Sequence, residues 1–158
     1  MTRVAAIDCG TNSIRLLIAD VDVASSKLTD VVRLMETVRL GEGVDRTGEF
    51  SAAALERTFA TCDRYADQIR THGVSKVEFV ATSASRDVSN RDEFANGVNS
   101  RLGVSPSVIT GEQEAQLSFA GAVKALGGQI GTEQALVVDI GGGSTEFVRG
   151  SVARGVSA

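Results

Sequence analysis

Three consecutive glycines, Gly141–Gly143, stand between two apolar segments near the end of the chain and constrain the fold more than any other feature. Glycine loses more backbone entropy on folding than any other residue, so a run of three indicates that the backbone must approach another group closely. The N–H groups of such a turn can form a cradle for an anion. Ser144 and Thr145 add hydroxyls, whereas the flanking Asp139 and Glu146 would repel phosphate unless a cation lay between them. The stretch therefore predicts a metal and phosphate site.

A second copy of this pattern lies near the N-terminus, at Asp8–Ser13. When the two stretches are aligned, Asp8 matches Asp139, the first glycine Gly10 matches Gly141, and an apolar segment follows each copy. Either loop alone would be typical of an ordinary hairpin turn. Two copies far apart in one chain predict a duplicated fold with one phosphate loop in each half.

Length and charge restrict the classes of function. A chain of 158 residues is long enough to bury the core of one ordinary domain. Its net charge of −4 argues against nucleic-acid binding. No apolar run has the length of a membrane span, and the N-terminus leads into a strand rather than a signal peptide. Cys9 and Cys62 are too few for a disulfide framework or a zinc site, so we expect a cytoplasmic protein with two packed thiols.

Hydrophobic periodicity and end signals predict the elements. Segment 41–48, rich in glycine, is expected to be a mobile connection. Asn90 with Glu93, and Thr110 with Gln113, match the capping-box pattern at two helix starts. The predicted strands are 4–7, 14–21, 28–40, 76–81, 107–109, 134–139 and 147–152, and the predicted helices are 51–73, 91–102 and 110–126, the last stopped by Gly127-Gly128.

Three strands followed by alternating helices and strands predict an α/β fold with a mixed sheet. The second phosphate loop should open a second lobe. We therefore expect residues 1–128 to form one lobe and residues 129–158 to supply only the opening strand-loop-strand of another. A hairpin alone is marginal in water, so the sequence resembles a truncated form.

Four motifs, in order along the chain, carry a resemblance to a known family: 8–13 (DCGTNS), 81–86 (ATSASR), 110–115 (TGEQEA) and 139–146 (DIGGGSTE). They resemble the exopolyphosphatase/guanosine pentaphosphate phosphohydrolase (Ppx/GppA) family, within the superfamily of actin, Hsp70 chaperones and sugar kinases. The resemblance implies a ribonuclease-H-like (actin-like ATPase) lobe, with the active site in the cleft between two such lobes.

The implied chemistry is the release of a terminal phosphate from inorganic polyphosphate or guanosine pentaphosphate, with Mg²⁺. Such a reaction depends on positioning and charge neutralisation more than on covalent catalysis. The resemblance implies that Glu114 is the base that activates water and that Arg86 pairs with a phosphate oxygen. The implied metal ligands are Asp139, Glu146 and Asp8. The implied phosphate-binding residues are Gly10, Thr11, Asn12, Ser13, Gly141, Gly142, Gly143, Ser144 and Thr145.

Several alternatives stay open at this point. Position alone does not separate Glu112 from Glu114 as the base; the family pattern favours Glu114. Arg86 could be a solvated charge, and Asp8 could satisfy only its own turn. The protein could instead be an ATP-dependent kinase or chaperone-type ATPase of the same superfamily, or a non-catalytic module that binds polyphosphate or an alarmone. The oligomeric state is open, a homodimer included, and we expect a chain of this length to fold but to hydrolyse polyphosphate poorly.

Overall fold

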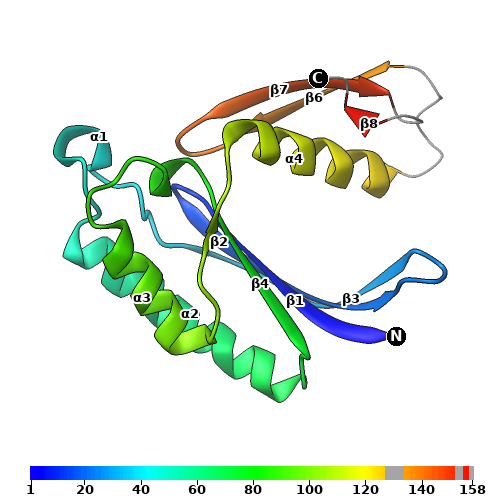
Figure 1. Ribbon diagram of the computed structural model, residues 1–158, viewed down its shortest axis with the longest axis horizontal. Helices are drawn as coiled ribbons and strands as arrows, with labels where there is room; N and C mark the ends of the chain where they lie inside the picture. Colours follow the sequence, from blue (N-terminus) through cyan, green and yellow to red (C-terminus); the bar gives the residue numbers. More distant parts are fainter. Residues whose placement is uncertain (127–133, 152–154, 157–158) are drawn as a thin grey trace.

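The chain folds around a five-stranded mixed sheet, followed by a smaller second sheet (Figure 1). The computed structural model describes residues 1–126, 134–151 and 155–156. The first sheet has the spatial order β3-β2-β1-β4-β5, in which β1, β2 and β3 are antiparallel neighbours and β4 and β5 run parallel to β1. Its strands are β1 (Thr2–Cys9), β2 (Ser13–Asp22), β3 (Lys27–Thr37), β4 (Lys76–Ala81) and β5 (Ser107–Val108). This is the predicted α/β fold, a ribonuclease-H-like lobe.

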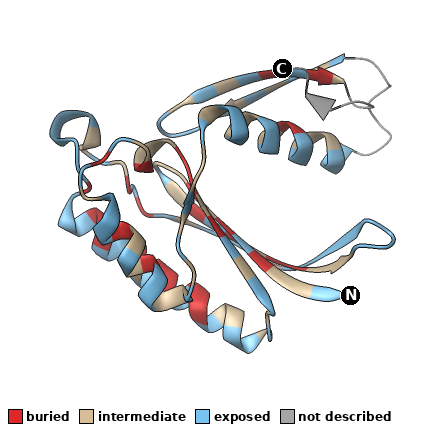
Figure 2. Cartoon of the chain, in the orientation of Figure 1, coloured by how far each residue is buried: buried red, intermediate tan, exposed pale blue. Residues whose placement is uncertain are grey.

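Two helices, α2 (Ala52–Thr71) and α3 (Arg91–Leu102), cover one face of the first sheet. Because side chains alternate along a strand, Ala5, Ile7 and Cys9 of β1 all point to this face and are buried. The buried residues gather between the sheet and the two helices (Figure 2). Tyr65 of α2 is fully buried, and its hydroxyl donates to the Ile14 carbonyl at 3.0 Å. The core thus fixes the end of β1, from which the first loop emerges.

Local end signals explain most helix boundaries. The Ser51 hydroxyl accepts from the Ala54 N–H and begins α2 as predicted. The capping box of Thr110 with Gln113 is confirmed, since each side chain accepts from the backbone N–H of the other residue. It begins α4 (Gly111–Leu126).

The predicted capping box at Asn90 is wrong. The Asn90 side chain makes no capping hydrogen bond at the start of α3. Instead its amide accepts from the Phe50 N–H at 2.9 Å and donates to the Phe50 carbonyl at 3.0 Å. Pairing with a backbone segment forty positions away satisfies both ends of the amide, which a local cap would not do.

Segment 41–48 was expected to be an irregular connection but includes a helical turn; its mobility stays a prediction. It contains the short helix α1 (Val44–Thr47), bounded by Gly43 and Gly48, both with positive φ. A further short turn, the 3₁₀ segment η1 (Ser83–Ser85), follows β4. Both segments are too short to show the hydrophobic period that marks a longer helix, so neither could be predicted from periodicity.

The second sheet is formed by β6 (Gln134–Ile140), β7 (Thr145–Ser151) and β8 (Gly155–Val156). Helix α4 packs on this sheet, contacting all three strands, with Phe119 and Val148 buried between them. The other face of the hairpin is apolar and exposed at Leu136, Ile140 and Phe147. The predicted boundary at residue 128 lies outside the described residues and stays a prediction.

Across the described part of the chain, no helix combines the length and the apolar character needed to cross a membrane.

Candidate active site

The two glycine loops have the same backbone arrangement. In the first loop the Gly10 N–H donates to the Ser13 carbonyl at 2.9 Å, and in the second the Gly141 N–H donates to the Ser144 carbonyl at 2.9 Å. Each loop joins two antiparallel strands, β1 to β2 and β6 to β7. The repeat seen in the sequence is therefore a repeat of structure.

The two hairpins differ in what faces the aspartate. Asp8 on β1 is opposite Arg15 on β2, whereas Asp139 on β6 is opposite Glu146 on β7. Arg15 donates to the Asp8 carboxylate at 3.2 Å. Like charges directly opposite on antiparallel strands are unfavourable, so the second hairpin carries two carboxylates that a cation would stabilise.

The two loops contact each other directly. A Cβ added at Gly142 would lie 2.8 Å from the Asn12 Cβ, and one added at Gly143 would lie 2.4 Å from the Thr11 Oγ1. The Thr11 and Ser83 hydroxyls are 2.9 Å apart, so η1 joins the same cluster. The close approach explains the triple glycine without invoking an unusual backbone conformation.

The loops present uncommitted donors. Within the described residues, the N–H groups of Thr11, Asn12, Gly142 and Gly143 donate to no backbone or side-chain acceptor. Successive free N–H groups in a turn are suited to an anion. Together the two loops can supply donors to one phosphate from two sides.

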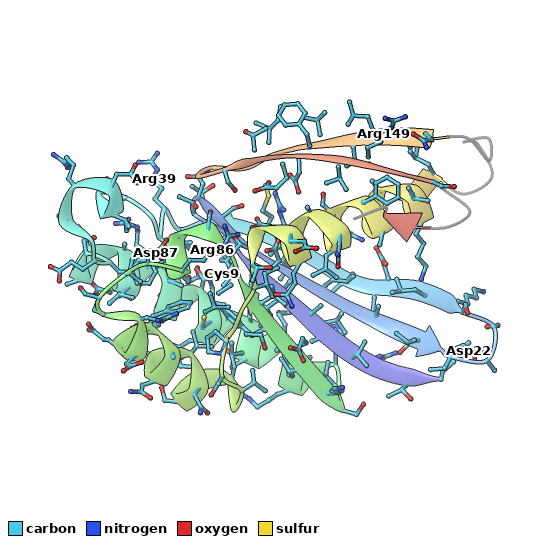
Figure 3. The ribbon with its side chains drawn as sticks, turned by 45° about the horizontal axis from the view of Figure 1, so that its top comes forward. Cys9, Asp22, Arg39, Arg86, Asp87 and Arg149 are labelled. Carbon is cyan, nitrogen blue, oxygen red and sulfur yellow. The ribbon has the colours of Figure 1, made fainter. Side chains whose placement is uncertain are left out.

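Arg86 and Glu114 form an ion pair beside these loops. Arg86 follows η1 at the end of β4, near the centre of the molecule in Figure 3. Its Nε donates to the Ile109 carbonyl at 3.0 Å, which orients the guanidinium, and its Nη2 donates to the Glu114 carboxylate. Both side chains are largely covered, with exposed fractions of 27% and 17%. The structure therefore brings these two predicted residues together.

Burial and neighbouring charges change the pKa of two carboxyl groups at this point, Glu114 and Asp8. Burial raises the pKa of Glu114; the charge of Glu146 raises it further, Arg86 lowers it, and Asp8 adds a smaller increase. Burial also raises the pKa of Asp8, which Arg15 lowers and Asp139 raises. For Glu146 and Asp8 to act on Glu114, and for Asp139 to act on Asp8, the carboxylates of both hairpins and of α4 must lie near one another.

The site offers a hard divalent cation two facing carboxylates, Asp139 and Glu146. The Ser118 hydroxyl donates to Asp139 Oδ2 at 2.7 Å and holds that carboxylate in place. Among the described residues, no group of three or more acidic, histidine or cysteine side chains converges at a metal-binding distance. Mg²⁺ typically uses one or two protein carboxylates and completes its shell with water and phosphate, so the facing pair of Asp139 and Glu146 suits it.

Two neighbouring residues are set apart from the site. Glu112 is exposed, and among the described residues its carboxylate accepts only from Gln116, at 3.5 Å. Of the two glutamates that the sequence left open, Glu114 is the one beside the loops; its role as a base stays a prediction.

Cys9 is buried, and burial raises the pKa of its thiol well above its usual value, which does not suit a nucleophile.

The residues predicted for the site do not include Arg15, Ser83 or Ser118, although helical spacing places Ser118 beside Glu114. The sequence contains a signal for two of these three residues. Arg15 occupies the position in the first copy that Glu146 occupies in the second. Ser118 lies four residues after Glu114, on the same helix face. No sequence pattern predicts that the Ser83 hydroxyl meets Thr11.

Comparison with known proteins places this arrangement in a family. The model of the Ppx/GppA phosphatase family matches residues 17–157, nearly the whole chain. The chain belongs to the Ppx/GppA phosphatase family. The family expected from the four motifs is thus confirmed.

Two curated proteins are similar to this chain over almost its whole length. Exopolyphosphatase 2 of Mycobacterium tuberculosis is 52% identical over 159 residues, covering 95% of this chain and 49% of the relative. A bifunctional 3-dehydroquinate synthase/phosphatase of Fusobacterium nucleatum is 35% identical, covering 94% of this chain and 23% of the relative. The chain spans about half the length of the exopolyphosphatase it matches.

Solved structures of the family share the fold. An exopolyphosphatase-like protein superposes with a TM-score of 0.90 at 46% identity, covering 96% of this chain and 46% of that one. A Ppx/GppA family member of Aquifex aeolicus gives 0.82 at 33% identity, covering 99% and 49%. An exopolyphosphatase of Cytophaga hutchinsonii gives 0.87 at 30% identity, covering 96% and 47%.

Proposed function

We propose that the protein is a phosphohydrolase that releases the terminal phosphate of inorganic polyphosphate. The observation that carries this proposal is the position of Glu114: a largely covered carboxylate, paired with Arg86, beside two loops that each have two N–H groups without an acceptor among the described residues. The activity is a proposal because the chain spans about half the length of the exopolyphosphatase it matches.

Binding uses both loops and Arg86. The N–H groups of Thr11, Asn12, Gly142 and Gly143 donate to oxygens of the terminal phosphate, and the hydroxyls of Ser13, Ser144 and Thr145 lie in the same two loops to assist. The Arg86 guanidinium, oriented by the Ile109 carbonyl, pairs with a phosphate oxygen. Such donors neutralise the charge that spreads over the transferred phosphoryl group.

The reaction is an attack of water on the terminal phosphorus. The P–O bond to the bridging oxygen breaks, the shortened chain leaves with that oxygen, and orthophosphate is formed. Glu114 accepts the proton of the attacking water, for which its raised pKa is better suited than that of an exposed carboxylate. Asp139 and Glu146, with Asp8 nearby, would hold Mg²⁺, which supplies charge neutralisation to the phosphate when bound.

The substrate is the finer part of the proposal. Polyphosphate is favoured because the relative with 52% identity is named an exopolyphosphatase. Guanosine pentaphosphate presents the same terminal phosphoanhydride and is the alternative substrate. ATP hydrolysis and non-catalytic binding are the competing functions from the superfamily, and the cytoplasmic location expected from the sequence stays a prediction.

Phosphate release from the three candidate substrates tests the proposal. The purified protein is incubated with Mg²⁺ and equal concentrations of polyphosphate ends, guanosine pentaphosphate or ATP. We expect the highest kcat/KM with polyphosphate. A preference for ATP would support the kinase or ATPase alternative, and tight polyphosphate binding without turnover would support a binding module.

A further inference from the structure

Arg39 has a backbone conformation that is rare for its residue type. It lies just after β3, with a φ of 51°. The only other described non-glycine residue with positive φ is Ser26, at the far β2–β3 turn. A bulky residue in the left-handed region is strained, and it persists only where the surrounding structure holds it. Arg39 is therefore a position at which an arginine is kept against its conformational preference.

The first phosphate loop holds Arg39 in this conformation. The Arg39 N–H and the Val38 N–H both donate to the Asn12 carbonyl, at 2.9 and 3.0 Å. Two residues on, the Gly41 N–H donates to the Thr11 carbonyl at 2.9 Å. The segment that carries Arg39 is thus bonded to the two central residues of the loop.

Helix α2 fixes the same segment from the other side. Arg57 donates through Nε to the Val38 carbonyl at 2.9 Å and pairs with Glu42 at 2.8 Å. A Cβ at Gly41 would lie 2.3 Å from the Thr11 Cγ2, so the segment fits closely against the loop. The backbone of Arg39 is held from both sides, while its side chain is exposed.

The Arg39 guanidinium is uncommitted. Three other arginines near the loops are paired: Arg15 with Asp8, Arg57 with Glu42 and Arg86 with Glu114. Within the described residues the Arg39 side chain has no ion pair or hydrogen bond. It is a free cation beside a phosphate loop, in a site that otherwise gathers carboxylates.

The geometry also places Arg39 near the second loop. Asn12, whose carbonyl accepts from Arg39, is the residue that Gly142 contacts. Figure 3 shows Arg39 at the same end of the molecule as the turn between β6 and β7. The segment that carries Arg39 is thus bonded to the part of the first loop that the second loop contacts.

We propose that Arg39 binds the phosphate next to the terminal one in a linear phosphate chain. This inference rests on the proposed function and adds to it a residue that selects a chain over a single phosphate. A guanidinium can donate two parallel hydrogen bonds to one phosphate, and a fixed backbone reduces the entropy lost on binding. Arg39 touches no reacting atom, so it contributes to substrate binding and not to the chemical step.

Substitutions at Arg39 can separate charge from backbone strain. Arg39→Gly removes the cation and relieves the positive φ, whereas Arg39→Lys keeps the cation. Ser26→Gly is the matched control, because it relieves the same kind of strain far from the site. The assays are phosphate release from tripolyphosphate and from long-chain polyphosphate, together with the affinity for fluorescently labelled polyphosphate without turnover.

We expect Arg39→Gly to raise KM roughly tenfold for both substrates, to weaken polyphosphate binding by a similar factor and to leave kcat unchanged. Arg39→Lys should recover part of this loss, and Ser26→Gly should match the unsubstituted protein. Inhibition by orthophosphate, which has one phosphate only, should be the same in all variants. Melting temperatures identify any variant that fails to fold.

Other outcomes overturn the inference in distinguishable ways. If Arg39→Gly matches the unsubstituted protein, or affects only long chains, Arg39 does not bind the second phosphate although the proposed function stands. If the unsubstituted protein neither binds nor hydrolyses polyphosphate, the proposed function itself fails and the inference with it.

Discussion

At the scale of single residues, the surroundings of Glu114 decide what the site can do. Its carboxylate is largely covered and paired with Arg86, so two opposing influences act on it. Burial and the charge of Glu146 raise its pKa, and Arg86 lowers it, with a net rise. An arginine partner thus orients the carboxylate without reducing its basicity to that of a fully paired surface group.

The raised pKa predicts the acid side of the pH–activity profile. A carboxyl whose pKa is raised holds its proton to higher pH in the folded than in the unfolded protein. The contribution of this carboxyl group to the stability of the folded protein is complete below the pKa of the unfolded chain, about 4.3. It is lost as the pH rises through the pKa of the folded protein. Since the base must be ionised, we expect kcat/KM to fall on the acid side at a pH above that ordinary value. Initial rates between pH 4 and 9 measure this limb, and a limb at or below the ordinary value would contradict the assignment.

At the scale of elements, the two hairpins share a register but have different electrostatic requirements. The β1–β2 hairpin neutralises its aspartate internally through Arg15. The β6–β7 hairpin places Asp139 opposite Glu146, and within the described part of the chain this pair receives one side-chain hydrogen bond, from Ser118 of α4. The same turn therefore carries an internally paired aspartate in one hairpin and two facing carboxylates in the other.

This difference predicts where Mg²⁺ acts. We expect Mg²⁺ to raise the melting temperature of the protein, and Asp139→Asn to weaken that response by roughly tenfold in Mg²⁺ concentration. The reason is that a neutral amide supplies one weak ligand and relieves the repulsion that the cation would otherwise offset. Asp30→Asn is the control, because Asp30 pairs with Arg33 on exposed β3. Equal Mg²⁺ titrations for Asp139→Asn and Asp30→Asn would show that Asp139 has a structural role only.

Alanine substitutions are expected to have opposite effects on stability at two glycines, one at the contact between the loops and one on an open helix face. Gly143→Ala places a methyl group against the Thr11 and Ser83 hydroxyls and should destabilise the protein by about 1–3 kcal/mol while weakening phosphate binding. Gly121→Ala, on an open face of α4, should stabilise it by about 0.5–1 kcal/mol. Chemical denaturation of both variants measures the difference. If Gly143→Ala is as stable as the parent protein, the two loops do not pack as described.

At the scale of the whole molecule, much of the fold followed from sequence. The mixed sheet could be predicted because strand periods and helix caps are local signals, and β4 and α3 match their predicted bounds. The duplicated loop predicted two copies of one strand-loop-strand unit, and both hairpins are present. Asn90 could not be predicted, because its partner Phe50 is brought near only by the folded chain.

The sequence motifs predicted which residues belong to the candidate site, but not how these residues contact one another. The motifs identify Glu114, Arg86 and the two loops, but their spacing does not reveal that the loops touch or that Arg86 meets Glu114. The short helix α1 was hidden because four residues carry no detectable period. Contacts between segments distant in sequence depend on packing, which local patterns do not encode.

The central claim is that Glu114, which lies beside the two loops, activates the water that attacks the terminal phosphate. Single-turnover phosphate release by Glu114→Gln, beside the matched Glu112→Gln, tests it most directly. We predict a fall of roughly 10²–10⁴-fold for Glu114→Gln, with polyphosphate affinity and melting temperature nearly unchanged, and near-normal rates for Glu112→Gln. Normal turnover by Glu114→Gln, or an equal loss in both variants, would contradict the claim.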